Sequence, residues 1–347
     1  MKESLAIVGA SAALRPCERA DLDRVLRRFP SGGKAVLIQI PQVPLDLLDR
    51  QVACNRGYFA FPPQGLLYVA ATLRRLGVES EILDLNFTVL AEVQRENADV
   101  EQAWRAALDV ALSRSKGAFV GVSFMFEPTY AQLAAVCRHV RTRAPTAFLG
   151  IGGVAATSDP RRILDDELGD LVFLHEGEGT VEALYAYARG QTALPPPNLA
   201  LRSVSGEAVL TPSAPAGPVE LSLAAEYAKI PIRDYHRVGS LSNYSRMMGA
   251  NVPYATVLSR RGCRAHCSFC SVRSFHGKGV RVRGVPYVVA EMEALRPVWP
   301  LTDGLDEPAG DALDRMLGAP EWRLILGLLD GAPVGFLAWR DEPMLPQ

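Results

Sequence analysis

Residues 35–190 alternate short apolar runs with longer amphipathic stretches, and this alternation restricts the chain to few folds. The run at 35–40 is almost continuously apolar, as in a strand buried on both faces. Further strands are predicted at 80–85, 119–124, 148–153 and 171–174, and helices at 62–77, 101–114, 128–143 and 179–188. Five strands that alternate with helices predict an α/β fold with a doubly wound parallel sheet. Such a sheet binds ligands at the carboxyl ends of its strands, where the strand order reverses.

Small and polar residues stand at these predicted strand ends. Ser123 ends the third strand, and Gly152 and Gly153 end the fourth, where glycine allows close backbone approach to a bulky ligand. Glu176 and Gly177 follow the fifth strand. The ligand site is therefore expected in these loops.

Three cysteines, Cys263, Cys267 and Cys270, fall within eight residues. Thiolates favour zinc or iron–sulfur clusters. A structural zinc site usually takes four protein ligands, so a zinc knuckle here would need His266 or His276 as the fourth. A cubane has four irons, and three cysteines would leave one iron open. A short β-branched run at 255–259 predicts a strand before this loop, and the apolar spacing over 285–295 predicts a helix after it.

The C-x3-C-x2-C spacing, with an aromatic residue before the last cysteine, resembles the cluster motif of the radical S-adenosylmethionine (radical SAM) enzymes. Residues 35–190 resemble the cobalamin-binding, Rossmann-like domain found ahead of many radical SAM barrels. The segments that carry this second resemblance are 62–77, 121–125, 150–160 and 176–179.

These resemblances imply three cofactors. Cys263, Cys267 and Cys270 would ligate a 4Fe-4S cluster whose open iron chelates S-adenosylmethionine, and one electron from the cluster would cleave the sulfonium to a deoxyadenosyl radical. Phe269 would pack near the adenine. Cobalamin would lie over the strand ends, with Ser123, Gly152, Gly153, Glu176 and Gly177 as its binding residues.

The chain departs from the family pattern in two places. Residues 41–46, after the first strand, lack the histidine of the D-x-H-x-x-G motif that some cobalamin domains donate to cobalt. Bound cobalamin is therefore expected without a protein histidine ligand, which suits methyl transfer. After residue 295 the strand–helix alternation stops, far short of the roughly 250 residues of a full eight-unit barrel, so an incomplete radical SAM (β/α) barrel is predicted.

The predicted organisation has five parts. They are an N-terminal extension at 1–34, the cobalamin-binding-like domain at 35–190, a proline-rich joining segment with little regular structure at 191–250, the start of the radical SAM domain at 251–295, and a divergent tail at 296–347 with a hairpin around Asp330 and Gly331.

Composition narrows the function. The 347 residues carry a net charge of −1 and are 48% hydrophobic, which argues against a dedicated nucleic-acid binder. No apolar run has the length of a membrane span. Free thiols and a cluster indicate a reduced cytoplasm. The sequence thus predicts a cytoplasmic radical SAM enzyme that methylates or otherwise modifies an unactivated carbon of a small molecule. Its electron donor would be of the flavodoxin or ferredoxin type. Two alternatives stay open: a non-catalytic cobalamin- or cluster-binding module or truncated remnant, and a zinc-knuckle protein.

Overall fold

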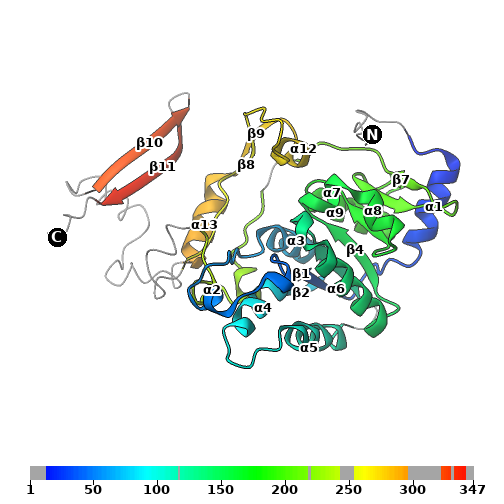
Figure 1. Ribbon diagram of the computed structural model, residues 1–347. Coiled ribbons are helices and arrows are strands. Elements are labelled where there is room, and N and C mark those ends of the chain that lie inside the picture. Colours follow the sequence, from blue (N-terminus) through cyan, green and yellow to red (C-terminus); the bar gives the residue numbers. More distant parts are fainter. Residues whose placement is uncertain are drawn as a thin grey trace. The chain divides into compact units, whose positions relative to one another are not determined.

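The computed structural model describes residues 13–115, 118–217, 220–242 and 254–295, and the backbone of two strands at 322–329 and 332–340 (Figure 1). The chain divides into two compact units, Met1–Val298 and Trp299–Gln347. The first unit holds a seven-stranded sheet, and the second holds a two-stranded hairpin.

The sheet of the first unit has the strand order β2-β1-β3-β4-β5-β6-β7. Its five parallel strands confirm the sequence prediction: β1 (Lys34–Gln39), β2 (Glu79–Asp84), β3 (Phe119–Ser123), β4 (Phe148–Gly152) and β5 (Leu171–Phe173). From β1 the chain goes to β2 on one side and then to β3 on the other. The strand order therefore reverses between β1 and β3, the position where sheets of this kind bind ligands.

Helices cover both faces of the sheet, so it is doubly wound as predicted (Figure 1). Alternate residues of β1 face opposite sides: Leu37 packs in one core and Val36 and Ile38 in the other. The core around Leu37 is covered by α1 (Pro16–Leu26), α3 (Gln64–Arg75) and α9 (Gly177–Ala188). The opposite core is covered by α5 (Val100–Ser113), α6 (Tyr130–Arg143), α7 (Val154–Ser158) and α8 (Pro160–Asp165). Shorter connections contain η1 (Leu45–Leu47), α2 (Arg50–Cys54), α4 (Leu85–Val93) and η2 (Glu127–Thr129).

The joining segment is more regular than the sequence indicated. β6 (Leu199–Arg202) and β7 (Ala208–Leu210) add two antiparallel strands beside β5. Residues 199–201 of β6 are fully buried, and burial of this apolar run stabilises the pairing of β6 with its neighbours. Because prolines surround these strands, the sequence did not indicate the hairpin that they form, whose turn contains Gly206 at φ 86°. The segment then forms η3 (Tyr227–Lys229) and α10 (Tyr235–Val238).

The strand predicted at 255–259 is wrong. Residues 254–258 have no regular structure, and Val257 and Leu258 pack against the core that contains Leu37. Instead, β8 (Arg260–Cys263) pairs antiparallel with β9 (Gly279–Val282), with α12 (Val272–His276) between them. A parallel barrel strand needs neighbouring strands for its hydrogen bonds, and the described residues provide none here.

The helix predicted after the cysteine loop is confirmed as α13 (Val285–Leu295). Within the described residues the barrel is not closed, as the sequence predicted. In the second unit, β10 (Trp322–Leu329) and β11 (Ala332–Arg340) form the expected antiparallel hairpin, with a register shift between Gly327 and Leu328. The rest of the predicted tail, including residues 296–321, lies outside the described residues.

Candidate functional site

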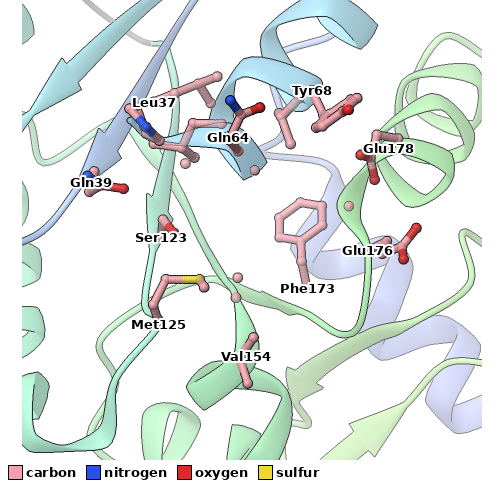
Figure 2. Close-up of a pocket in the computed structure, with 18 of the residues that line it drawn as sticks. Leu37, Gln39, Gln64, Tyr68, Ser123, Met125, Val154, Phe173, Glu176 and Glu178 are labelled. Atoms are coloured by element: carbon pink, nitrogen blue, oxygen red, sulfur yellow. The ribbon is translucent and has the colours of Figure 1, made fainter. Parts of the chain in front are cut away.

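A cavity of about 590 Å³, here called the strand-end cavity, opens at the carboxyl ends of the parallel strands (Figure 2). It lies between the sheet and helices α3 and α9, on the side of the strand-order reversal. Five of the residues that the sequence singled out line it together: Ser123, Gly152, Gly153, Glu176 and Gly177. Cys263, Cys267, Cys270 and Phe269 lie outside its lining residues.

Glycines and aromatic rings form the floor of this cavity. A Cβ atom at Gly150 would lie 2.5 Å from Cε2 of Phe173 and 3.0 Å from Cε2 of Phe119, and one at Gly121 would lie 2.9 Å from Cδ2 of Leu37. The rings of Phe173 and Phe119 therefore leave no room for a side chain at Gly150, while at Gly121 the side chain of Leu37 would have to shift. Gly121 and Gly150 were not among the site residues predicted from the sequence, although glycine inside a strand is a recognised signal of close approach.

The backbone at Gly153 is constrained by both conformation and space. Its φ of 117° lies in a region that residues with a side chain rarely adopt, and a Cβ atom would lie 2.4 Å from the carbonyl oxygen of Phe124. At Gly177, the first residue of α9, a Cβ atom would lie 3.4 Å from Cγ2 of Val69 on α3. Glycine is therefore required at Gly153, whereas a Cβ atom at Gly177 would make an ordinary van der Waals contact.

Three exposed apolar side chains, Phe61, Met125 and Phe126, also belong to the cavity lining. Their exposed fractions are 36%, 37% and 43%. A largely apolar lining with few polar groups is typical of sites for large organic ligands. These residues could not be predicted from the sequence, because single apolar residues in loops form no periodic pattern.

Two polar residues at the strand ends are buried and paired. Asp84 ends β2, accepts a hydrogen bond from Oη of Tyr235 at 2.5 Å and one from Nε2 of Gln39 at 3.1 Å. Burial raises the pKa of the Asp84 carboxyl to about 6 despite these bonds. Gln39 itself lines the cavity, so this buried network fixes one wall of it.

His175 follows β5 with φ 61° and lines the cavity. Its N–H donates to Oγ1 of Thr157 at 2.9 Å, which holds the unusual backbone conformation. The loop after β1, which would carry a cobalt-binding histidine in the D-x-H-x-x-G pattern, has none.

Cys263 ends β8, and Cys267 and Cys270 lie on the loop between β8 and α12. Cys263 is half-buried, whereas Cys267 and Cys270 are exposed, and Phe269 is 90% exposed. Among the described residues, no three His, Cys, Asp or Glu side chains are gathered closely enough to hold a metal ion. The structure thus places the three thiols in one accessible loop without converging them. As a donor set, three thiolates fit a soft metal centre.

An ion-pair cluster joins this part of the chain to the cavity. We call residues 260–283 the cysteine segment. Within it, Nη1 of Arg261 donates to Oε2 of Glu176 at 2.9 Å, and Nη1 of Arg281 donates to the same oxygen at 3.0 Å. Nδ1 of His276 lies 2.5 Å from Oε1 of Glu176, and Nη2 of Arg261 donates to Oε1 of Glu178 at 2.6 Å.

The carboxyl of Glu176 is strongly favoured in its charged form. Burial alone raises its pKa, but the hydrogen bonds from His276 and Arg281 and the charge of Arg261 outweigh burial and lower the pKa to about 2. Glu176, expected from the sequence among the cofactor-binding residues, thus has both oxygens engaged by cations of the cysteine segment.

A second, fully buried ion pair holds α13. Arg283 and Glu291 have side chains exposed by 1% and 0%, and Nη1 of Arg283 donates to Oε2 of Glu291 at 3.0 Å. Arg283 also donates to the carbonyl oxygens of Leu221 at 2.6 Å and Leu258 at 2.7 Å, and Glu291 accepts from the N–H of Leu223 at 3.0 Å. The pair therefore ties α13 to the joining segment.

Comparison with known proteins agrees with this geometry. The family model of the B12 binding domain matches residues 51–185. Cytidylyl-2-hydroxyethylphosphonate methyltransferase of Streptomyces wedmorensis is 31% identical over 271 residues, which is 71% of this chain and 49% of that protein. Hopanoid C-3 methylase of Methylococcus capsulatus (strain ATCC 33009 / NCIMB 11132 / Bath) is 27% identical over 244 residues, 69% of this chain and 41% of that protein. The chain thus spans less than half the length of these relatives.

The fold is also found among solved structures. The radical S-adenosylmethionine methyltransferase TsrM from Kitasatospora setae, determined with cobalamin and a [4Fe-4S] cluster bound, matches with a TM-score of 0.51 and 20% identity over 77% of this chain and 46% of that chain. Among the described residues, no helix combines the length and apolar character that crossing a bilayer requires. The chain thus matches the B12 binding domain over residues 51–185, is related in sequence to a methyltransferase and a methylase, and shares the fold of a radical S-adenosylmethionine methyltransferase.

Proposed function

We propose that this chain binds cobalamin in the strand-end cavity and a 4Fe-4S cluster on the cysteine segment, and that the protein methylates an unactivated carbon of a small molecule. The observation that carries the proposal is the apolar cavity at the strand-order reversal, with Ser123, Gly152 and Gly153 at its edge. The methyltransferase relatives support the reaction type, although each is matched over less than half its length.

The cavity suits a large, flat ligand. Gly121 and Gly150 leave its floor to aromatic rings, and Phe61, Met125 and Phe126 offer exposed apolar surface at the lining. When bound, cobalamin supplies a methyl carrier, and a cluster with S-adenosylmethionine supplies one-electron chemistry. The residues of this chain would bind and orient these groups and exclude water from the space between them.

The individual residues are assigned roles from the family resemblance. Cys263, Cys267 and Cys270 would ligate three irons as thiolates. Phe269, on the same exposed loop, would cover the adenine of S-adenosylmethionine. Since the loop after β1 has no histidine, cobalt would receive no imidazole from that loop. A flavodoxin- or ferredoxin-type donor would reduce the cluster, and a reducing cytoplasm would preserve the thiols.

Anaerobic reconstitution tests the cluster. The protein treated with iron and sulfide should turn brown and hold about four irons per chain, and Cys267→Ala should lose them. Cys17→Ala is a matched control, since Cys17 is also exposed but lies on α1. A colourless protein with one bound zinc would contradict the proposal and favour the zinc knuckle.

Absorption spectroscopy tests cobalamin binding independently of the cluster. Titration with hydroxocobalamin should give a saturable spectral change without the signature of a protein histidine on cobalt. Failure to bind would leave the sheet as a docking domain for the cysteine segment.

A non-catalytic binding module is the second candidate. It is favoured by the separated thiols and by the open barrel of the described residues. Cleavage of S-adenosylmethionine by the reconstituted protein, followed as release of 5′-deoxyadenosine or of the demethylated product, separates the two. Bound cluster and cobalamin without any turnover would support the module.

A further inference from the structure

We propose that Glu176 is a positioning residue that fixes the cysteine segment relative to the strand-end cavity and thereby couples occupancy of the cavity to the placement of the three cysteines. This inference rests on the proposed function for the identity of the cavity ligand. The contacts of Glu176 carry the coupling itself.

Glu176 occupies a special place between the two sites. It precedes α9 at the carboxyl end of β5 and lines the cavity, where Figure 2 shows it with Glu178, Phe173 and Tyr68. Its side chain is only 6% exposed. Because Glu176 is itself a lining residue, a ligand that displaces the cavity lining would displace Glu176 as well.

The partners of Glu176 stand on both sides of the cysteines in the sequence. Arg261 precedes Cys263 on β8, whereas His276 ends α12 and Arg281 lies on β9, both after Cys270. The carboxylate of Glu176 lies 2.9 Å from Arg261, 2.5 Å from His276 and 3.0 Å from Arg281. It thus holds the beginning and the end of the loop together.

Burial makes this arrangement sensitive to loss of the carboxylate. Arg261 is 6% exposed and lies 4.1 Å above the ring of Tyr68, in a site with little water to solvate its charge. Removing one member of a buried ion pair leaves the other charge uncompensated, so the cations would be expected to move out towards solvent. The loop that carries the cysteines would move with them.

Glu178 provides a matched comparison. It pairs with the same Arg261 at 2.6 Å, and its side chain is 17% exposed. Its contact holds only the beginning of the loop, on β8. If Glu176 acts by joining both ends, Glu178→Gln should have a smaller effect than Glu176→Gln.

Hydrogen–deuterium exchange of the full chain tests the positioning role without any cofactor. Amides of residues 264–276 should exchange at least about fivefold faster in Glu176→Gln than in the native protein. Glu176→Asp, which keeps the charge, should recover part of the protection, and Glu178→Gln should stay close to native. Amides of β1 and β3 should be unchanged in all variants, which reports that the sheet is folded.

The same measurement with added hydroxocobalamin tests the coupling. The ligand should slow exchange over residues 264–276 in the native protein and not in Glu176→Gln. Because coupling is reciprocal, the variant should also bind cobalamin at least about fivefold more weakly. If cobalamin binds neither protein, the proposed function fails, while the exchange of the ligand-free variants still decides the positioning role.

Two results would overturn the inference. One is native-like exchange of residues 264–276 in Glu176→Gln, and the other is an equal loss of protection in Glu178→Gln. If Glu176→Gln fails to fold, Arg281→Met replaces it, since Arg281 is 24% exposed and its loss frees only the end of the loop. Unchanged exchange in Arg281→Met would then count against the inference.

Discussion

The buried pair of Arg283 and Glu291 allows a quantitative prediction for α13. In Glu291→Gln the Arg283 side chain, 1% exposed, keeps its two carbonyl acceptors but loses its carboxylate partner. Breaking a buried pair from one side costs about 3–5 kcal/mol. At 1.36 kcal/mol per factor of ten, this corresponds to roughly 10²- to 10⁴-fold faster exchange of the α13 amides, up to the limit set by global unfolding.

Native-state hydrogen exchange over residues 285–295 measures this opening. Glu293→Gln is the matched control, because Glu293 is exposed on the same helix. The double variant Arg283→Met/Glu291→Met should lose less than Glu291→Gln, since it removes both charges from the interior. Exchange in Glu291→Gln that is no faster than in Glu293→Gln would refute the reasoning that this pair holds α13 in place.

Three further predictions concern the sheet and its cavity. Gly153→Ala should lower the free energy of unfolding by roughly 1–3 kcal/mol in urea titrations, because its Cβ meets a carbonyl oxygen at φ 117°, whereas Gly65→Ala, with open space around it, should be near neutral. Burial raises the pKa of Asp84 from its usual 3.8 to about 6, so between these pH values the folded protein binds the proton more tightly than the unfolded chain. The free energy of unfolding should therefore fall as the pH rises from about 4 to about 6, and Asp84→Asn should flatten this dependence. Phe173→Ala should lower the free energy of unfolding by about 3–5 kcal/mol in thermal or urea titrations, since Phe173 is 6% exposed and its ring fills the space over Gly150. A loss below about 1 kcal/mol would show that the floor of the cavity collapses to fill the gap.

The parallel sheet was predictable because its signals are local. Each parallel strand is a short apolar run, and the helices between the strands show one apolar face, so β1 to β5 and the main helices follow from nearby residues. The same holds for α13 and for the hairpin at 322–340. The cavity residues Ser123, Gly152 and Gly153 were found because strand ends of a parallel sheet share one edge.

The docking of the cysteine segment could not be predicted in this way. Arg261 and Arg281 lie 85 and 105 residues from Glu176, and no periodicity in the sequence pairs charges over such separations. The strand expected at 255–259 failed for a related reason, since a β-branched run becomes a strand only if another strand supplies its hydrogen bonds. Tertiary contacts with the core around Leu37 decide the conformation there.

The order of the strands has a consequence for how copies of this chain meet. One edge of the sheet is β7, which has only three residues, and the other is β2, which carries Glu79 and Glu81. Short edge strands and charged edge side chains both discourage the addition of a strand from another molecule. The seven-stranded sheet is therefore protected at both edges against intermolecular β-pairing. Self-association of this domain is expected to use side-chain surfaces and not a sheet continued from one molecule to the next.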